Sequence, residues 1–261
     1  MKILLQRQFF GFGDWLMMAS AIKQINVSRP DIDVSVDVSS IPVSRSIDAE
    51  VMTDFDIRAT VCRNRPYLPD YTYVVPHVSY PRRSDRHLIA EMVNHIAEQC
   101  PGIGPIGYDD SIRAVYTSHG ADAVMQTINP GYVLMPSQGI LRTSGHKEWG
   151  GFEELARTLR YQHGEHIAQV AVDGDRPLRW ATHQFYQLDL SRLVSLVRES
   201  KYVISLENGL SHLAGHLRHP CYTLYRHSAT APCHTTYDKQ VAITDEVLTA
   251  DTVASRIKGV R

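Results

Sequence analysis

The sequence predicts an α/β protein made of two doubly wound domains, each with a parallel sheet between helices. Two observations lead to this prediction. Short apolar runs typical of buried strands alternate with segments of helical periodicity, which is the pattern of successive βαβ units. The alternation begins again after Pro130. We therefore expect an N-terminal domain at residues 1–126 and a C-terminal domain at residues 127–261 that ends in a helix.

The first half opens with a strand, a glycine turn and a helix. The apolar run KILLQ (2–6) is followed by Gly-Phe-Gly-Asp and by an apolar, helix-compatible segment at 15–25. A loop is expected at 100–110, which holds two prolines and three glycines. Three further strands are expected at 33–38, 57–62 and 71–76, and one further helix at 87–99.

The second half shows the same alternation. After the strand YVLMP (132–136) we expect a polar loop at 137–150 and then a helix with Phe152, Leu155, Ala156 and Leu159 on one face. The next strand is expected at 168–172, followed by a helix that carries Leu190, Leu193, Val194 and Val197. The remaining elements are a buried strand at 202–206 that leads into a turn and helix, a strand at 221–225, and a terminal helix at 250–260.

Composition narrows the classes of function. A formal net charge of −1 argues against a protein that coats nucleic acid by bulk electrostatics. No run approaches the ~20 apolar residues that a membrane span needs, and the first residues lack the features of a signal peptide, so we expect a cytoplasmic protein. The four cysteines form no CxxC pair, which argues against a disulfide framework or a zinc ribbon.

Positive charge is concentrated in the first half. Between residues 58 and 86 six arginines stand against two acidic residues. The six are Arg58, Arg63, Arg65, Arg82, Arg83 and Arg86. They are either a solvated loop surface or a site for an anionic acceptor, because the guanidinium fork suits phosphates.

The segment SLENGLSHLAGHLRHP (205–220) carries the strongest chemical pattern. A buried strand ends in a glycine turn and enters a helix, so that backbone N–H groups and the positive helix end suit a diphosphate. Gly209 permits close approach, while Ser211 and His212 add hydrogen-bonding groups. The alternative is a plain strand-to-helix turn with Asn208 as the helix cap and His212 as a buried histidine.

This segment resembles the ADP-heptose:lipopolysaccharide heptosyltransferase family, which is glycosyltransferase family nine. The family has Asp-Thr-Gly-Pro-Met-His-Leu-Ala where this chain has Glu-Asn-Gly-Leu-Ser-His-Leu-Ala, so that Glu207 and Asn208 are departures. The resemblance implies a GT-B fold, in which two Rossmann-like domains face a cleft. It also implies that Glu207, Asn208, Gly209, Ser211 and His212 bind a nucleotide-sugar donor.

Two further stretches are similar to the family in order and spacing. Residues 3–25 resemble its opening strand, glycine turn and Gly-Asp, which implies a catalytic base at Asp14 and an acceptor contact at Gly13. Asp14 is otherwise an N-cap at a helix start. Residues 136–159 resemble the family's loop, with Gly150 in place of its proline. There Lys147, Thr143 and Ser144 would bind the donor pyrophosphate. A solvated loop lysine is the alternative.

Other sequence patterns give weaker evidence about function. Asp31-Ile-Asp33, Asp54-Phe-Asp56 and Asp173-Gly-Asp175 each spell DxD, a metal-binding pattern, but three such strings among 28 acidic residues are close to chance. We expect no metal site and no cofactor beyond the nucleotide-sugar co-substrate. Asp173 follows an expected strand, where the family often places an acidic contact to the nucleoside, so a ribose contact is expected at that residue.

The function implied by the resemblance is metal-independent, inverting transfer of a sugar from a nucleotide donor to an acceptor hydroxyl. Arg63, Arg65, Arg82 and Arg83 join Gly13 as expected acceptor contacts. The acceptor is a lipopolysaccharide core, another glycan or a modified nucleic-acid base. The alternatives are a nucleotide-sugar epimerase on the same fold and a non-catalytic protein that binds sugar nucleotides.

Overall fold

The chain divides into two compact units, Met1–Ser118 and His119–Arg261. The computed structural model describes residues 1–6, 11–41, 46–76, 78, 86–117, 131–136, 149–171, 175–225, 237–244 and 248–259. The expected domain boundary after residue 126 lies outside these described residues.

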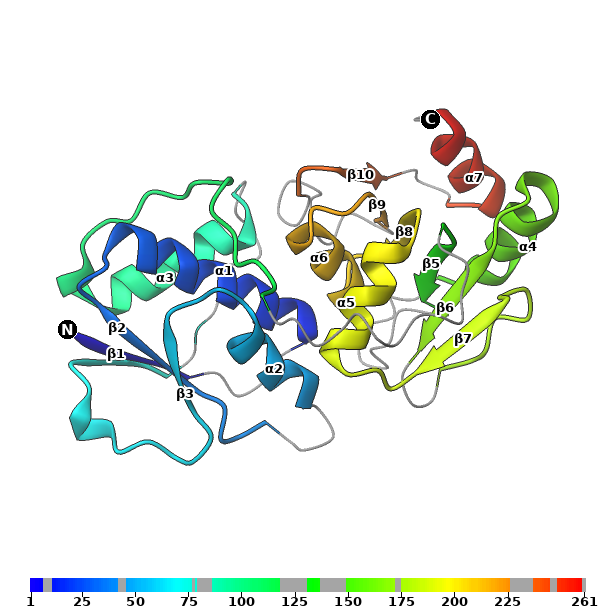
Figure 1. Ribbon diagram of the computed structural model, residues 1–261. Coiled ribbons are helices and arrows are strands. Elements are labelled where there is room, and N and C mark those ends of the chain that lie inside the picture. The colour runs from blue at the N-terminus through cyan, green and yellow to red at the C-terminus, as the bar shows by residue number, and fades with distance from the viewer. Residues whose placement is uncertain are drawn as a thin grey trace. The chain divides into compact units, whose positions relative to one another are not determined.

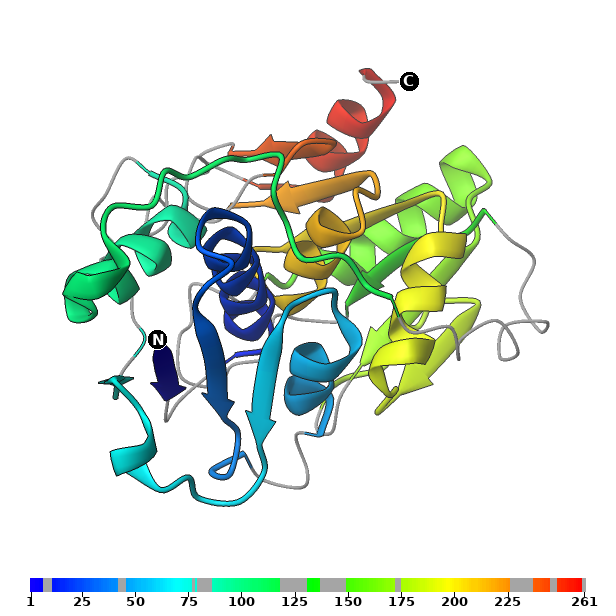
Figure 2. The same ribbon diagram turned by 60° about the vertical axis from the view of Figure 1, so that its left-hand side comes forward.

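The first unit contains a parallel sheet in the strand order β3-β2-β1-β4 (Figure 1). Its strands are β1 (Lys2–Gln6), β2 (Asp33–Asp37), β3 (Ala59–Cys62) and β4 (Tyr73–Val75). Its helices are α1 (Phe12–Ser28), α2 (Ser46–Asp54) and α3 (Leu88–Gln99), with short 3-10 turns at Leu68–Asp70 and Pro101–Ile103. Helix α1 packs against both α2 and α3, so the three helices form a continuous layer (Figure 2).

The second unit contains a larger parallel sheet in the order β10-β9-β8-β5-β6-β7. Its strands are β5 (Val133–Pro136), β6 (Ile167–Ala171), β7 (His183–Tyr186), β8 (Tyr202–Leu206), β9 (Cys221–Leu224) and β10 (Gln240–Ile243). Its helices are α4 (Phe152–His163), α5 (Leu190–Glu199), α6 (Gly209–His216) and α7 (Ala250–Gly259).

Burial follows position within the second sheet. Every residue of β5, β8 and β9 is buried, whereas β7 at the sheet edge alternates between half-buried and exposed residues. Central parallel strands are covered on both faces and therefore read as continuous apolar runs. A core cluster joins this sheet to α4 and α7, with Phe152, Leu155 and Val253 among its members. Helix α6 lies against β8 and β9.

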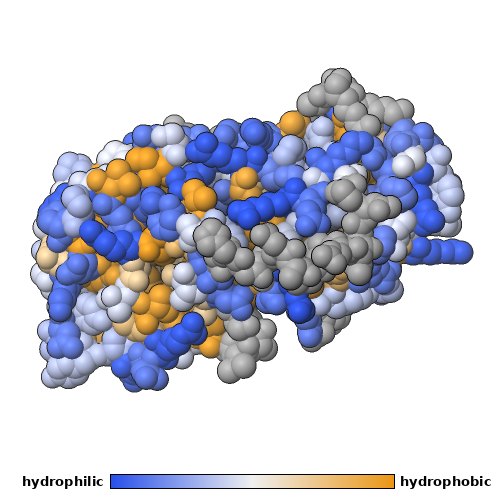
Figure 3. Space-filling model, in the orientation of Figure 1, coloured by the Kyte–Doolittle hydropathy of each residue, from blue (hydrophilic) through white to orange (hydrophobic). Residues whose placement is uncertain are grey.

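Within the described residues, the structure confirms every strand and helix expected from the sequence. It adds helix α2, strands β7 and β10, and the two 3-10 turns. On the face shown in Figure 3, apolar residues stand in small groups between hydrophilic ones. Among the described residues, no helix is both long enough and apolar enough to cross a bilayer.

Candidate functional site

The turn from β8 into α6 brings together most of the residues expected to bind a donor. Strand β8 is buried up to Leu206, Glu207 and Asn208 form the turn, and α6 begins at Gly209. Because this turn follows the carboxyl end of a central parallel strand, it lies at the edge where open α/β sheets bind ligands.

Asn208 caps α6 with its side chain. Its Oδ1 accepts hydrogen bonds from the backbone N–H groups of Leu210 (2.9 Å) and Ser211 (3.4 Å) and from Ser205 Oγ (2.9 Å). Ser211 Oγ completes a capping box, because it accepts a hydrogen bond of 3.1 Å from the Asn208 N–H. Helix α6 therefore satisfies the N–H groups of Leu210 and Ser211 internally. The N–H of Gly209 has no acceptor among the described residues.

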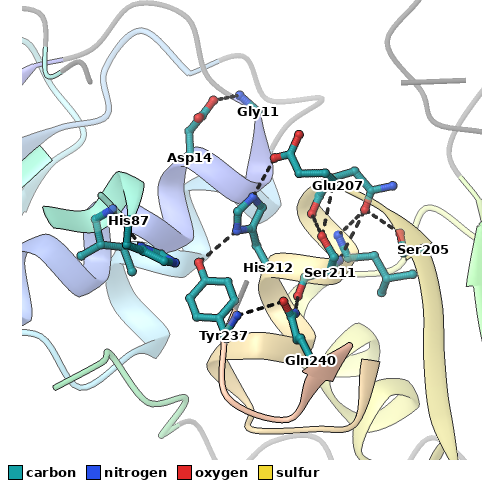
Figure 4. A network of polar contacts seen from close by, with 12 residues as sticks. Gly11, Asp14, His87, Ser205, Glu207, Ser211, His212, Tyr237 and Gln240 are labelled. Carbon is teal, nitrogen blue, oxygen red and sulfur yellow. Dashed lines mark hydrogen bonds and ion pairs between the residues drawn. The ribbon is translucent and has the colours of Figure 1, made fainter. Parts of the chain in front are cut away.

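His212 lies on the first turn of α6 and is 2% exposed. Its Nε2 lies 3.1 Å from Glu207 Oε1, and its Nδ1 lies 3.0 Å from the Tyr237 hydroxyl (Figure 4). A carboxylate only accepts hydrogen bonds, so Nε2 carries a proton, and in the neutral ring Nδ1 then accepts from the Tyr237 O–H. Both ring nitrogens are thus occupied, as the alternative of a buried histidine expects. Of the three hydrogen-bonded side chains, Glu207 is the one that reaches solvent, since its side chain is 15% exposed.

Tyr237 and Gln240 belong to this network and were not identified from the sequence. Gln240 Oε1 accepts a hydrogen bond from the Tyr237 N–H at 3.2 Å, and Gln240 Nε2 donates to the Ser211 carbonyl at 2.6 Å. A Cβ on Gly215 would overlap the Tyr237 ring, so only glycine lets that ring pack on α6. The glycine inside a helix was the one sequence signal of this close approach.

In the first unit, α1 begins with Gly11 as its N-cap, which has no side chain to satisfy the first amides. Asp14 stands at the third helical position, and its Oδ2 accepts a hydrogen bond of 2.9 Å from the Gly11 N–H (Figure 4). A carboxylate in the first turn is favoured by the helix dipole. The side chain is half-buried, and Gly13 beside it is buried. Asp14 is therefore part of a capping arrangement, and a role as a base stays a prediction.

A second carboxylate, Asp37, lies where β2 ends. Gln6 Nε2, at the end of β1, donates to Asp37 Oδ2 at 2.9 Å, while the Ser39 hydroxyl donates to Asp37 Oδ1 at 2.6 Å. The carboxyl ends of adjacent parallel strands meet at one edge, so these polar groups share that edge of the first sheet. The sequence reasoning had not singled them out.

The other expected site residues divide by position. Arg63 and Arg65 are exposed and follow the carboxyl end of β3. Arg58 precedes β3 and donates to the carbonyls of Pro30 and Ile32, so its guanidinium has a structural role. The remainder lie outside the described residues, namely Arg82, Arg83, Thr143, Ser144, Lys147 and Asp173.

Two of the DxD strings have partners within the protein. Asp31 forms an ion pair of 2.7 Å with Arg29, which lowers the pKa of its carboxyl to about 2. Asp56 forms one of 2.7 Å with Lys23 and accepts a hydrogen bond from the Val115 N–H. The first string ends at the first residue of β2 and the second precedes β3, so both stand at the amino end of the sheet. In the part of the chain that the structure describes, no group of three residues has the composition and spacing of a metal site.

The two units of this protein, with parallel sheets of four and six strands, have the GT-B fold of glycosyltransferases. No family model and no curated protein matches the sequence. Among solved structures, E. coli heptosyltransferase WaaC with ADP is 15% identical, with a TM-score of 0.58 and all of both chains covered. E. coli ADP-heptose lipopolysaccharide heptosyltransferase II is 14% identical, with a TM-score of 0.65 over 100% of this chain and 98% of that one.

The same fold extends to another class of enzyme. The UDP-GlcNAc 2-epimerase of Methanocaldococcus jannaschii, solved with UDP-GlcNAc and UDP, is 9% identical, with a TM-score of 0.52 over 98% of this chain and 91% of that one. At such identities the likeness shows the fold, and function has to be argued from the residues at the site.

Proposed function

We propose that this chain is a glycosyltransferase that moves a sugar from a nucleotide-diphosphate donor to an acceptor hydroxyl. The residues at the site carry the proposal, on a fold that this chain shares over its whole length with heptosyltransferases, including WaaC with ADP. The residues that resemble that family stand where ligands bind on such folds, at strand ends.

The donor is proposed to lie at the β8–α6 turn. The diphosphate is proposed to bind the Gly209 N–H together with Lys147, Thr143 and Ser144, which follow β5 in the sequence, and Asp173 is proposed to bind the ribose. Glu207 borders this position, and as a carboxylate it is repelled by phosphate. Glu207 therefore suits the hydroxyl groups of the donor sugar, which donate hydrogen bonds to it.

The reaction is proposed to be a single inverting displacement. The acceptor oxygen forms a bond to the anomeric carbon as the bond from that carbon to the diphosphate oxygen breaks. Asp14 takes the proton of the acceptor hydroxyl, and the nucleoside diphosphate leaves with the electron pair. Gly13, Arg63, Arg65, Arg82 and Arg83 are the proposed acceptor contacts, and the arginines favour an anionic acceptor.

No metal ion is needed in this proposal. Lys147 and the start of α6 supply positive charge to the leaving diphosphate. The ion pairs of Asp31 and Asp56 support this view, because they give both carboxylates a structural role. EDTA is expected to leave turnover largely unchanged. Loss of turnover in EDTA, with recovery on adding magnesium or manganese, would overturn metal independence.

An epimerase is the second candidate, and the likeness to the UDP-GlcNAc 2-epimerase structure favours it. The two candidates share a donor site and differ in their need for an acceptor. An epimerase changes its nucleotide sugar with no other substrate present.

A panel of ADP-, UDP-, GDP- and CDP-sugars, with the free nucleotides as controls, tests the donor class by thermal unfolding. A ligand at about 100 times its Kd stabilises the folded protein by ~2.7 kcal/mol, which is a shift of about 5 °C at this size. We expect one nucleotide sugar to raise the melting temperature more than its free nucleotide does. If no nucleotide or nucleotide sugar raises it, the proposed function is wrong.

A further inference from the structure

The carboxylate of Glu207 is connected to the interior by a chain of two hydrogen bonds. Glu207 bonds to His212, and His212 bonds to Tyr237. The Glu207 side chain is 15% exposed, whereas His212 and Tyr237 are both buried, at 2% and 3% exposed. Figure 4 shows the three side chains in line, from the turn before α6, from α6 itself and from the segment before β10.

Both the ring and the backbone of Tyr237 are held in place by contacts with α6 and with Gln240. Its ring packs edge-to-face on His212, with centroids 5.8 Å apart, and is tilted against His216 at 5.2 Å. Gly215 provides the space for this ring, and Gln240 fixes the Tyr237 backbone to the Ser211 carbonyl. The Tyr237 hydroxyl can therefore fix both the tautomer and the ring orientation of His212.

A glutamate needs such support more than an aspartate does. The glutamate side chain is longer than that of aspartate and loses more rotamer freedom when it is fixed. The hydrogen bond from His212 Nε2 removes much of that freedom in advance, because it holds the carboxylate in the unliganded protein.

We propose that His212 and Tyr237 are positioning residues that hold Glu207 in the orientation that binds the hydroxyl groups of the donor sugar. This inference rests on the proposed function. Neither residue touches the donor. Tyr237 acts through His212, and His212 acts through Glu207.

Tyr237→Phe removes the hydroxyl and keeps the ring, and Tyr132→Phe is the matched control. Tyr132 is a fully buried tyrosine of the same unit whose hydroxyl donates to the Leu196 carbonyl at 2.7 Å. Both variants lose one buried hydrogen bond and should lose similar stability. Only Tyr237→Phe is expected to lower kcat/KM for the donor, by about ten-fold, since misplacement of a substrate contact slows the reaction. Affinity for the free nucleoside diphosphate should stay within about two-fold.

Glu207→Ala supplies the background that tests whether Tyr237 acts through Glu207. In that background Tyr237→Phe should change kcat/KM by less than about two-fold, because the side chain through which it acts is gone. An undiminished ten-fold effect there, or equal losses in Tyr237→Phe and Tyr132→Phe, would overturn the inference while leaving the proposed function in place. Absence of sugar transfer by the wild-type protein would overturn the proposed function and this inference with it.

Discussion

The β1–α1 segment and the β8–α6 turn both lead from the carboxyl end of a parallel strand into a helix, and each carries a carboxylate there. Asp14 is held by the N–H of Gly11, three residues away. Glu207 is held by His212, which depends in turn on Tyr237, thirty residues further along the chain than Glu207.

The helix starts differ as well. Asn208 gives α6 a side-chain cap, whereas Gly11 gives α1 none. This difference is consistent with the roles proposed above for the two carboxylates. Asp14, held by its own turn, suits a base that has to receive a proton. Glu207, held from the interior, suits a contact whose geometry must stay fixed.

The largest expected effect comes from Asp14→Asn. Asparagine keeps an oxygen that accepts the Gly11 N–H, so α1 should begin as before, but it cannot take a proton from the acceptor. We expect turnover to fall by roughly a thousand-fold, within the usual range for loss of a general base.

Donor affinity measured by calorimetry is the control for Asp14→Asn. It should stay within about three-fold, because a base acts in the transition state. Loss of donor binding with turnover retained would assign Asp14 to the donor site instead.

A smaller effect on stability is expected from Gly215→Ala. The added methyl group overlaps the Tyr237 ring, and such overpacking costs about 1–3 kcal/mol. Gly150→Ala is the matched control in the same unit, since a Cβ there meets no atom within 4 Å. Urea unfolding of both variants measures the difference. Equal stability of the two would mean that Tyr237 does not pack closely on α6.

His219, three residues beyond the end of α6, should make the free energy of unfolding depend on pH. Burial, with a further contribution from Lys239, lowers the pKa of His219 to about 4 from its ordinary 6.5. The unfolded chain then binds the proton more readily, so the stabilisation is present above pH 6.5 and is lost as pH falls towards 4. The loss is at most about 3 kcal/mol.

His219→Gln tests this dependence, because glutamine keeps an N–H donor for Ser200 Oγ and does not titrate. The slope of unfolding free energy against pH between 4 and 6.5 should be flatter in this variant than in the wild type. An unchanged slope would show that folding does not lower the pKa of His219.

Asn208→Ala should have the smallest effect. Loss of an N-cap acceptor typically costs about 1 kcal/mol, and Asn208→Ser, which keeps a capping oxygen, should recover most of it. Thermal unfolding of the two variants gives the comparison. If alanine were neutral, the amides of Leu210 and Ser211 would have to be satisfied by other groups.

Local patterns in the sequence predicted most of the fold. Helices α4 and α5 show clear helical periodicity, β5 is a continuous apolar run, and β8 is apolar except for Ser205. Strand β7 escaped prediction because an edge strand with half-exposed residues, His183 to Tyr186, has no strong apolar signal. Helix α2 was missed because its apolar residues do not gather on one face of the helix.

The part of the candidate site that is formed by residues close together in the sequence was predictable. The strand, glycine turn and helix at 202–216 follow from the sequence, and the capping role of Asn208 was one of two alternatives that the sequence left open. The partner of His212 was not predictable, because Tyr237 approaches from 25 residues further along the chain and only the fold brings them together. The roles of Lys147 and Asp173 stay predictions.

Sugar transfer is tested most directly by release of nucleoside diphosphate from the donor that the panel selects, measured with and without acceptor. We expect release only when an acceptor is present, with one nucleoside diphosphate formed for each sugar transferred. Conversion of the donor to another nucleotide sugar without an acceptor, or tight binding with no release under either condition, would contradict the proposed sugar transfer.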